Sequence, residues 1–266
     1  MASWPMPIPE LSPSAFRWRL ALLLGLALVF IAAALALPAI PQNPAYHGFA
    51  DTRPWLGIPN AGDVLSNLPF VAAGLIGLLG WRRSAWREPG DRWPWLVIAL
   101  GTLLVGLGSG YYHLHPDNRT LFWDRLPMTL VFMALFAAAL AERVHARAGL
   151  LLLLPFLALG VLSVLVWRRG ELTGVGDLRF YLLVQFYPLV ALPLCLLLFP
   201  ARYDRGGDLG LLAAAYVAAK LCEQFDRGLF AALGGALSGH TLKHLLAAGG
   251  IGWVLAKLPA RRPRVD

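Results

Sequence analysis

Two histidines near the C-terminus are spaced as ligands of one metal ion. His240 and His244 are four residues apart, so on a helix they lie on one face, one turn apart. Ser109 and His113 have the same spacing, which turns a hydroxyl and an imidazole in one direction. A third histidine from another helix would complete a three-histidine site with an open fourth position, as catalytic zinc requires. Asp124 follows eleven residues after His113 and could reach a water molecule at that position.

Each of these features alone has a simpler explanation. Two helical histidines at a membrane interface are often polar anchors, and Ser109 could be a small residue at a helix contact. Asp124 could form a structural ion pair with the neighbouring Arg125. Three histidines, one aspartate and one serine together favour a metal site over these separate explanations. The remaining histidines are expected in loops, either solvated or without partners: His47, His115 and His145.

The chain that must position these residues has the composition of a membrane protein. Of its 266 residues, 58% are hydrophobic and 14% are charged, and the mean hydropathy is +0.61. A soluble domain carries about 25% charged residues, so this composition excludes an ordinary globular enzyme. The net charge of +8 does not indicate nucleic-acid binding, because the arginines lie between apolar runs, where membrane topology explains them. Cys195 and Cys222 lie in apolar segments and are expected to be core residues.

Eight apolar segments approach the roughly 20 residues that cross a bilayer as a helix. They are residues 19–40, 64–81, 93–112, 121–140, 149–167, 180–199, 208–225 and 240–257. The predicted fold class is therefore all-α, a polytopic membrane helix bundle. The first segment could instead be a secretory signal that ends near Ala34-Leu35-Ala36.

The basic residues orient these spans in the membrane. Arginine and lysine are more numerous on the cytoplasmic side when the N-terminus is placed there, which predicts that both termini are cytoplasmic. The third span then runs outward and the fourth and eighth run inward. His113, Asp124 and His240 therefore gather at one depth, near the external membrane face.

Other polar residues within the spans are less specific. Lys220 and Glu223 are three residues apart and are expected to form an ion pair. Lys243 lies between the two candidate ligands, on the other side of the helix, and is expected to extend outward. Asn67 and Gln185 are expected to form hydrogen bonds between helices.

Three stretches, GSGYYHLHPDN, LFWDRLPM and SGHTLKHL, resemble those of the alkaline ceramidase (alkaline phytoceramidase) family, and of its bacterial members in particular. This family belongs to the seven-span superfamily of hydrolases and receptors that includes the adiponectin receptors. The resemblance covers residues 51–258, with the seven family helices at the second to eighth spans. It implies an N-terminal tail and extra helix in 1–41, a seven-helix ceramidase-like domain in 42–258 and a basic cytoplasmic tail in 259–266.

The resemblance also implies a zinc ion held by His113, His240 and His244, with Asp124 as general base and Ser109 stabilising the oxyanion. The implied activity is a zinc-dependent amidohydrolase that cleaves ceramide-like N-acyl lipids to a fatty acid and a sphingoid base. Its substrate would be a membrane lipid that enters the helix bundle, and its location the bacterial inner membrane. No nucleic acid and no protein partner is expected.

Eukaryotic ceramidases of this type also hold calcium in an acidic segment before the first core helix. The matching stretch here offers Asp51, Asn60 and Asp63, fewer carboxylates than that segment has. Calcium takes six to eight oxygen ligands, and a calcium site here would have to draw on these three residues and on backbone oxygens or water. The alternative is turn chemistry, because Asp-Thr-Arg-Pro and Pro-Asn-Ala-Gly are turn formers.

Three alternatives to a ceramidase follow from the same sequence. The substrate could be another acyl lipid. The chain could be a receptor or signalling protein that resembles the adiponectin receptors, with zinc in a structural role. It could also be a transporter, which predicts broken helices at the membrane midplane and repeated halves, and the sequence has neither pattern.

Overall fold

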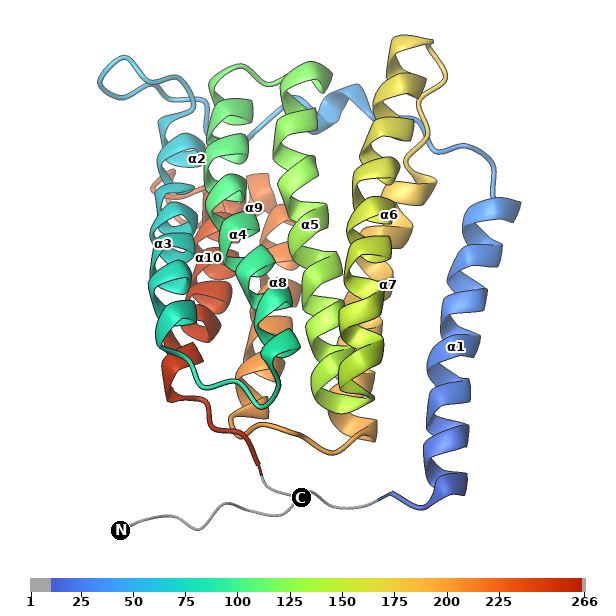
Figure 1. Ribbon diagram of the computed structural model, residues 1–266. Coiled ribbons are helices and arrows are strands. Elements are labelled where there is room, and N and C mark those ends of the chain that lie inside the picture. The colour runs from blue at the N-terminus through green and yellow to red at the C-terminus, as the bar shows by residue number, and fades with distance from the viewer. Residues whose placement is uncertain (1–10, 265–266) are drawn as a thin grey trace.

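The computed structural model describes residues 11–264, and its helices run side by side as one bundle (Figure 1). The helices are α1 (Pro13–Ala36), α2 (Ala61–Leu65), α3 (Leu68–Arg83), α4 (Arg92–Leu114), α5 (Asn118–Arg143), α6 (Ala146–Leu172), α7 (Arg179–Leu198), α8 (Gly206–Gln224), α9 (Asp226–Ala232) and α10 (Gly239–Lys257), with 3₁₀ turns at Pro44–His47, Pro89–Asp91 and Leu258–Ala260. The predicted all-α class is confirmed. Residues 1–10 of the predicted N-terminal tail and 265–266 of the basic tail lie outside the described residues.

A helix occurs at each of the eight predicted apolar segments. Six of these spans are long and apolar enough to cross a membrane: α1, α2 with α3, α4, α5, α6 and α7. The two others, α8 and α10, carry charged or histidine side chains at several positions, which lowers their apolarity. The polytopic membrane bundle is therefore confirmed, and the candidate site residues lie on α4, α5 and α10.

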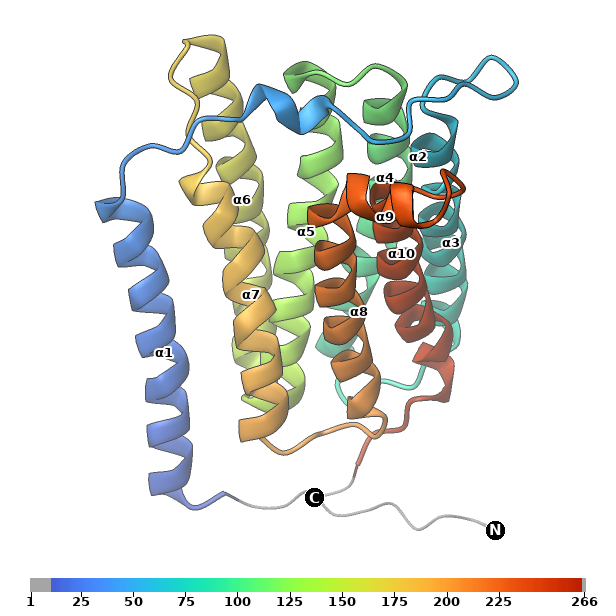
Figure 2. The same cartoon turned by 180° about the vertical axis from the view of Figure 1, so that it is seen from behind.

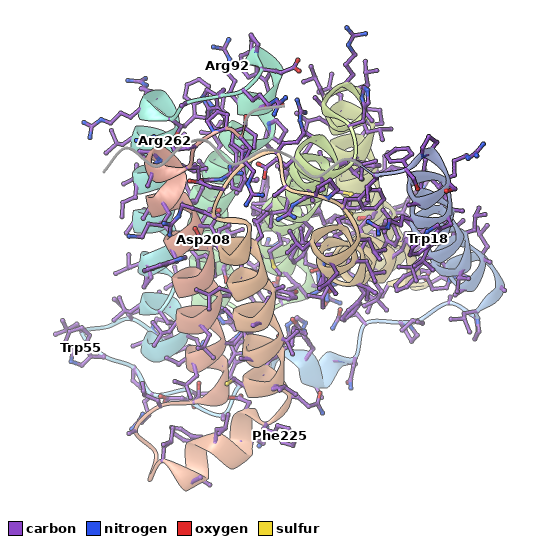
Figure 3. All side chains as sticks on the ribbon, turned by 90° about the horizontal axis from the view of Figure 1, so that it is seen from below. Trp18, Trp55, Arg92, Asp208, Phe225 and Arg262 are labelled. Carbon is purple, nitrogen blue, oxygen red and sulfur yellow. The ribbon has the colours of Figure 1, made fainter. Side chains whose placement is uncertain are left out.

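Helix α1 stands to one side of the other helices and packs mainly against α7. Figure 3, a view along the bundle, shows Trp18 of α1 set apart from the remaining helices. Leu23 joins α1 to a small apolar cluster with Ala191 and Leu192 of α7. The larger core lies elsewhere, where α4 packs between α3 and α5 and α10 packs between α3 and α8. The extra N-terminal helix is thus peripheral to the core that holds the site residues.

Two glycines let helix backbones approach each other at the level of the candidate site. A Cβ on Gly108 would lie 2.0 Å from the carbonyl oxygen of Trp123, so α4 reaches α5 only without a side chain there. A Cβ on Gly239 would lie 2.2 Å from the carbonyl oxygen of Cys222, so α10 begins directly against α8. The residue after each glycine is a predicted site residue, and these contacts therefore set its position.

The segment between α1 and α2, residues 37–60, crosses one end of the bundle (Figures 1 and 2). We call it the linker segment, and the end it crosses the linker end; the described chain begins and finishes at the opposite end. His47, which the sequence analysis left without a partner, bonds through Nδ1 to the Tyr112 hydroxyl at 2.8 Å and through Nε2 to Asn118 Oδ1 at 2.9 Å. That expectation was wrong because the linker segment folds back onto α4 and α5.

A buried ion pair closes the opposite end of the bundle. Arg261 Nη2 lies 2.5 Å from Glu142 Oε2, and both side chains are buried. Glu142 also accepts a hydrogen bond from Trp95 Nε1 at 2.9 Å, and the Arg261 guanidinium lies over the Trp95 ring at 4.7 Å. The pair thereby joins α4, α5 and the segment after α10.

Glu142→Gln is expected to lower the free energy of unfolding by about 3–5 kcal/mol, because it leaves the Arg261 charge buried without a counter-ion. Thermal unfolding in detergent would show the loss. The matched control is Glu88→Gln, which removes the half-exposed partner of Arg202, a pair with a 3.3 Å separation. An exposed pair contributes about 0–1 kcal/mol. Equal losses in the two variants would contradict this assignment.

Candidate functional site

The structure brings together the three histidines that the sequence analysis singled out. The ring centroid of His113 lies 4.8 Å from that of His240 and 4.9 Å from that of His244, and the His240 and His244 centroids are 4.8 Å apart. One potential ligand nitrogen from each ring lies within 4.8 Å of the others. All three residues are buried, at 1%, 5% and 3% exposure. This group could hold a metal ion.

Local structure explains why the three rings meet. His113 lies in the last turn of α4, where its carbonyl oxygen accepts a hydrogen bond from Asn60 Nδ2 at 2.8 Å. Ser238 caps α10 by accepting from Thr241 N at 2.9 Å, so the helix begins with His240 in its first turn. Asp226 accepts from the His240 backbone N–H at 2.8 Å. The ends of two helices therefore supply all three imidazoles.

The unpaired nitrogen of His113 indicates that a metal ion fits this site. Its Nδ1 is buried and has no hydrogen-bond partner. The Phe49 ring packs against both His113 and His240, with centroid distances of 4.6 and 4.7 Å, and so covers the site with an apolar surface. A buried imidazole nitrogen without a partner costs about 1–3 kcal/mol, which coordination of a cation would offset. Three neutral imidazoles are a donor set compatible with zinc.

Ser66 orients the third imidazole. Its Oγ lies 2.8 Å from His244 Nδ1 and donates to the Asp63 carbonyl oxygen at 3.0 Å. Because the serine proton is used on that carbonyl, the oxygen accepts from His244 Nδ1–H. The lone pair of the His244 ring is then on Nε2, where it is available to a metal ion.

Ser66→Ala is expected to weaken zinc affinity by about 10–100-fold, because the His244 ring loses the contact that sets its tautomer and orientation. Competition with a chelator of known affinity measures this change. Ser84→Ala is the matched control, since Ser84 follows the far end of α3 and its hydroxyl donates to the Gly80 carbonyl there. Unchanged affinity in Ser66→Ala would remove this orienting role.

Lys243 points into the bundle, which corrects the outward direction expected from the sequence. Its Nζ donates to Glu223 Oε1 at 2.8 Å and lies 3.1 Å from His240 Nε2. Glu223 also pairs with Lys220, as the sequence analysis predicted. Lys243 turns inward because it forms an ion pair with the buried carboxylate of Glu223 on α8. This pairing is more favourable than leaving the ammonium group solvated at the surface.

Asp124 and Ser109 lie beside the histidines. They come from α5 and α4, and the Ser109 hydroxyl donates to the Asp124 carboxylate. Asp124, Ser109 and His244 line the same cavity. Arg125 forms no ion pair with Asp124; its Nη2 donates instead to Gln42 Oε1 at 2.6 Å. The structural explanation that Asp124 serves to pair with Arg125 therefore does not hold.

The cavity is an apolar chamber with a polar end. Its volume is about 410 Å³, within the range of small-molecule sites. The polar end holds Ser109, Asp124 and His244 together with residues of the linker segment. Away from it the wall is formed by apolar side chains of α4, α5, α7, α8 and α10, among them Val105, Val131, Phe132, Leu189, Leu212 and Ile251. The arrangement places titratable groups beside space for a hydrocarbon chain.

The three residues considered for calcium have protein partners. Asp51 forms an ion pair with Arg53 at 2.8 Å, and this contact lowers the pKa of the Asp51 carboxyl. Asp63 Oδ1 accepts hydrogen bonds from Thr241 at 2.8 Å and Ser238 at 3.2 Å, which ties α2 to the start of α10. Asn60 donates to His113, as described above. These contacts give each residue a structural role, and the calcium site stays a prediction.

Several residues at the site were missed by the sequence analysis. Phe49, Ser66 and Asp226 contact the histidines from the linker segment, α2–α3 and α9, respectively. None of them has a spacing that marks it, because each reaches the site from a segment distant in sequence. His115, in contrast, is exposed at the end of α4, in agreement with the expected solvated position.

The site thus combines a buried triad of histidines, a carboxylate with a hydroxyl partner, and an apolar cavity. Comparison with known proteins adds no relative: no protein-family model matches the chain, and no curated protein matches its sequence. The functional argument therefore depends on the geometry of these residues.

Proposed function

We propose that this chain is a zinc-dependent membrane hydrolase that cleaves the amide bond of ceramide-like N-acyl lipids. The observation that supports it best is the three-histidine group whose member His244 lines a cavity together with Asp124 and Ser109. Structural metal sites are usually closed by four protein ligands, whereas three ligands next to a cavity leave a position for a reactant. With ceramide as substrate, the products would be a fatty acid and a sphingoid base.

Each residue of the site has a separate role in the proposed reaction. A zinc ion bound to the histidines would supply a Lewis acid that acidifies water and polarises a carbonyl group. Asp124 is the general base: its carboxylate removes a proton from the attacking water and later gives it to the leaving amine nitrogen. Ser109 donates to that carboxylate before the reaction, and its hydroxyl would turn to the oxyanion as that charge develops. The apolar wall holds the acyl chain and excludes bulk water from the amide.

Membrane orientation is part of this proposal. The described chain begins and finishes at one end of the bundle, whereas the end of α4 and the start of α10, which carry the histidines, lie toward the linker end. The excess of arginine and lysine at the end where the described chain begins and finishes predicts that this end is cytoplasmic. The site would then lie toward the external face of a bacterial inner membrane.

The test is release of labelled fatty acid from ceramide by the purified protein. We expect release that stops when a chelator removes zinc and returns when zinc is added back. Folded, zinc-loaded protein that releases no fatty acid from ceramide or from other N-acyl and ester lipids would overturn the hydrolase proposal. That result would support a structural role for the metal, as in the receptor alternative.

A further inference from the structure

A buried arginine at the polar end of the cavity has no carboxylate partner. Arg125 on α5 is 5% exposed and lines the cavity with Gln42, Tyr46 and Tyr181. None of the ion pairs among the described residues involves it. Burial of a guanidinium charge is costly unless an anion compensates it, and buried charges within membrane spans mark functional sites.

The surroundings of Arg125 leave part of its guanidinium without a hydrogen-bond acceptor. The guanidinium carbon lies 4.4 Å from the ring centroid of Trp167 and 4.7 Å from that of Tyr181, so aromatic rings hold the group by cation–π contact. On the guanidinium edge, Nη2 donates to Gln42, but Nη1 is buried without a hydrogen-bond partner. Nη1 therefore lacks an acceptor, which a ligand in the cavity beside Arg125 could supply.

The charges that line the cavity favour an anion. Lys220 and Lys243 share Glu223, and Asp124 is held by Ser109. Three cations, Lys220, Lys243 and Arg125, therefore face only the two carboxylates of Glu223 and Asp124 in the cavity wall, which leaves one positive charge in excess, and a zinc ion at the histidines would add more. A planar carboxylate matches the remaining donor edge of a guanidinium.

We propose that Arg125 binds a carboxylate on the headgroup of the lipid substrate, so that within the proposed class of N-acyl lipids the enzyme prefers acidic N-acyl amines to neutral ones such as ceramide. The selectivity for substrate rests on the proposed hydrolase function; the anion site itself does not. A carboxylate could reach Arg125 from two sources, the amine part of the substrate or the fatty acid that hydrolysis releases. The headgroup is favoured because Arg125 lies at the polar end of the cavity, while the apolar wall takes the acyl chain.

Binding of three lipids with the same acyl chain separates these sources. N-oleoylglycine carries an acidic headgroup, N-oleoylethanolamine a neutral one, and oleate a carboxylate at the acyl end. Affinities are measured in detergent with the Asp124→Asn protein, which prevents turnover. We expect N-oleoylglycine to bind at least about tenfold more tightly than N-oleoylethanolamine, because a hydrogen bond to a charged group gives that much discrimination.

Variants of Arg125 in the Asp124→Asn protein test whether Arg125 causes the preference for N-oleoylglycine. Arg125→Gln is expected to bring the affinity ratio close to one, and Arg125→Lys, which keeps the charge, to retain part of it. Arg169→Gln is the matched control, since Arg169 is exposed on α6 and does not line the cavity. A loss of thermal stability in Arg125→Gln with an unchanged ratio would show a structural role only and overturn the proposal.

Two further results have distinct meanings. Arg125-dependent binding of oleate without preference for N-oleoylglycine would assign the site to the fatty acid and overturn the headgroup. A preference for N-oleoylglycine in a zinc-loaded wild-type protein that hydrolyses neither N-acyl lipid would support the anion site and count against the hydrolase function.

Discussion

His240→Ala is expected to abolish zinc binding and lipid hydrolysis together. Two imidazoles would remain, and the loss of a direct ligand should exceed the roughly 10–100-fold loss of affinity that follows from removing an orienting contact. Elemental analysis of the purified protein should fall from about one zinc per chain to near zero. The fold should persist, because His240 contributes no helix cap and no ion pair; the contact with Asp226 is made by its backbone.

His115→Ala is the control for this experiment. His115 is exposed one residue beyond α4, two positions from the ligand His113, and no metal-binding group includes it. Zinc content and hydrolysis should both remain at the wild-type level in this variant. Full zinc occupancy in His240→Ala would show that the three histidines do not form the metal site.

Asp124→Asn is expected to reduce hydrolysis by about 10²–10⁴-fold while zinc stays bound. The amide keeps the shape and the hydrogen bond with Ser109, but it cannot accept a proton from water, which is the contribution of a general base. Single-turnover rates with ceramide in detergent would measure the loss, and elemental analysis of the same sample would measure zinc.

Asp177→Asn makes the same chemical change outside the cavity. Asp177 pairs with Arg179 at the start of α7 and does not line the cavity. Its hydrolysis rate should match the wild type. If Asp124→Asn lost its zinc as well, the carboxylate would have to be assigned to metal binding, and undiminished hydrolysis would exclude it as the base.

The sequence predicted the features of the site that depend on local periodicity. The four-residue spacing of His240 and His244 places both on one face of α10, and alternation of span direction brought His113 to the same depth. These predictions require only that each segment is a helix and that successive helices reverse direction. Both conditions follow from length and apolarity, which is why the helical bundle was predictable.

Side-chain directions at the site were not predictable in this way. Lys243 turns inward because Glu223, twenty residues earlier, lies opposite it, and nothing within α10 indicates that contact. His47 and Gln42 reach the bundle from the linker segment, which has no periodicity to reveal its path. Such contacts depend on how segments distant in sequence pack against each other. This packing cannot be inferred from the residue spacing of a single sequence.

The linker segment lies over the end of the bundle nearest the histidines, and its residues 40–43 and Tyr46 form part of the cavity wall. An acyl lipid has negligible solubility in water and reaches such a cavity from the surrounding bilayer. The substrate concentration that the enzyme meets is then the concentration within the bilayer, which is set by the mole fraction of the substrate among the membrane lipids. Diluting the substrate with inert lipid should therefore slow the reaction, whereas diluting the vesicles in buffer should not.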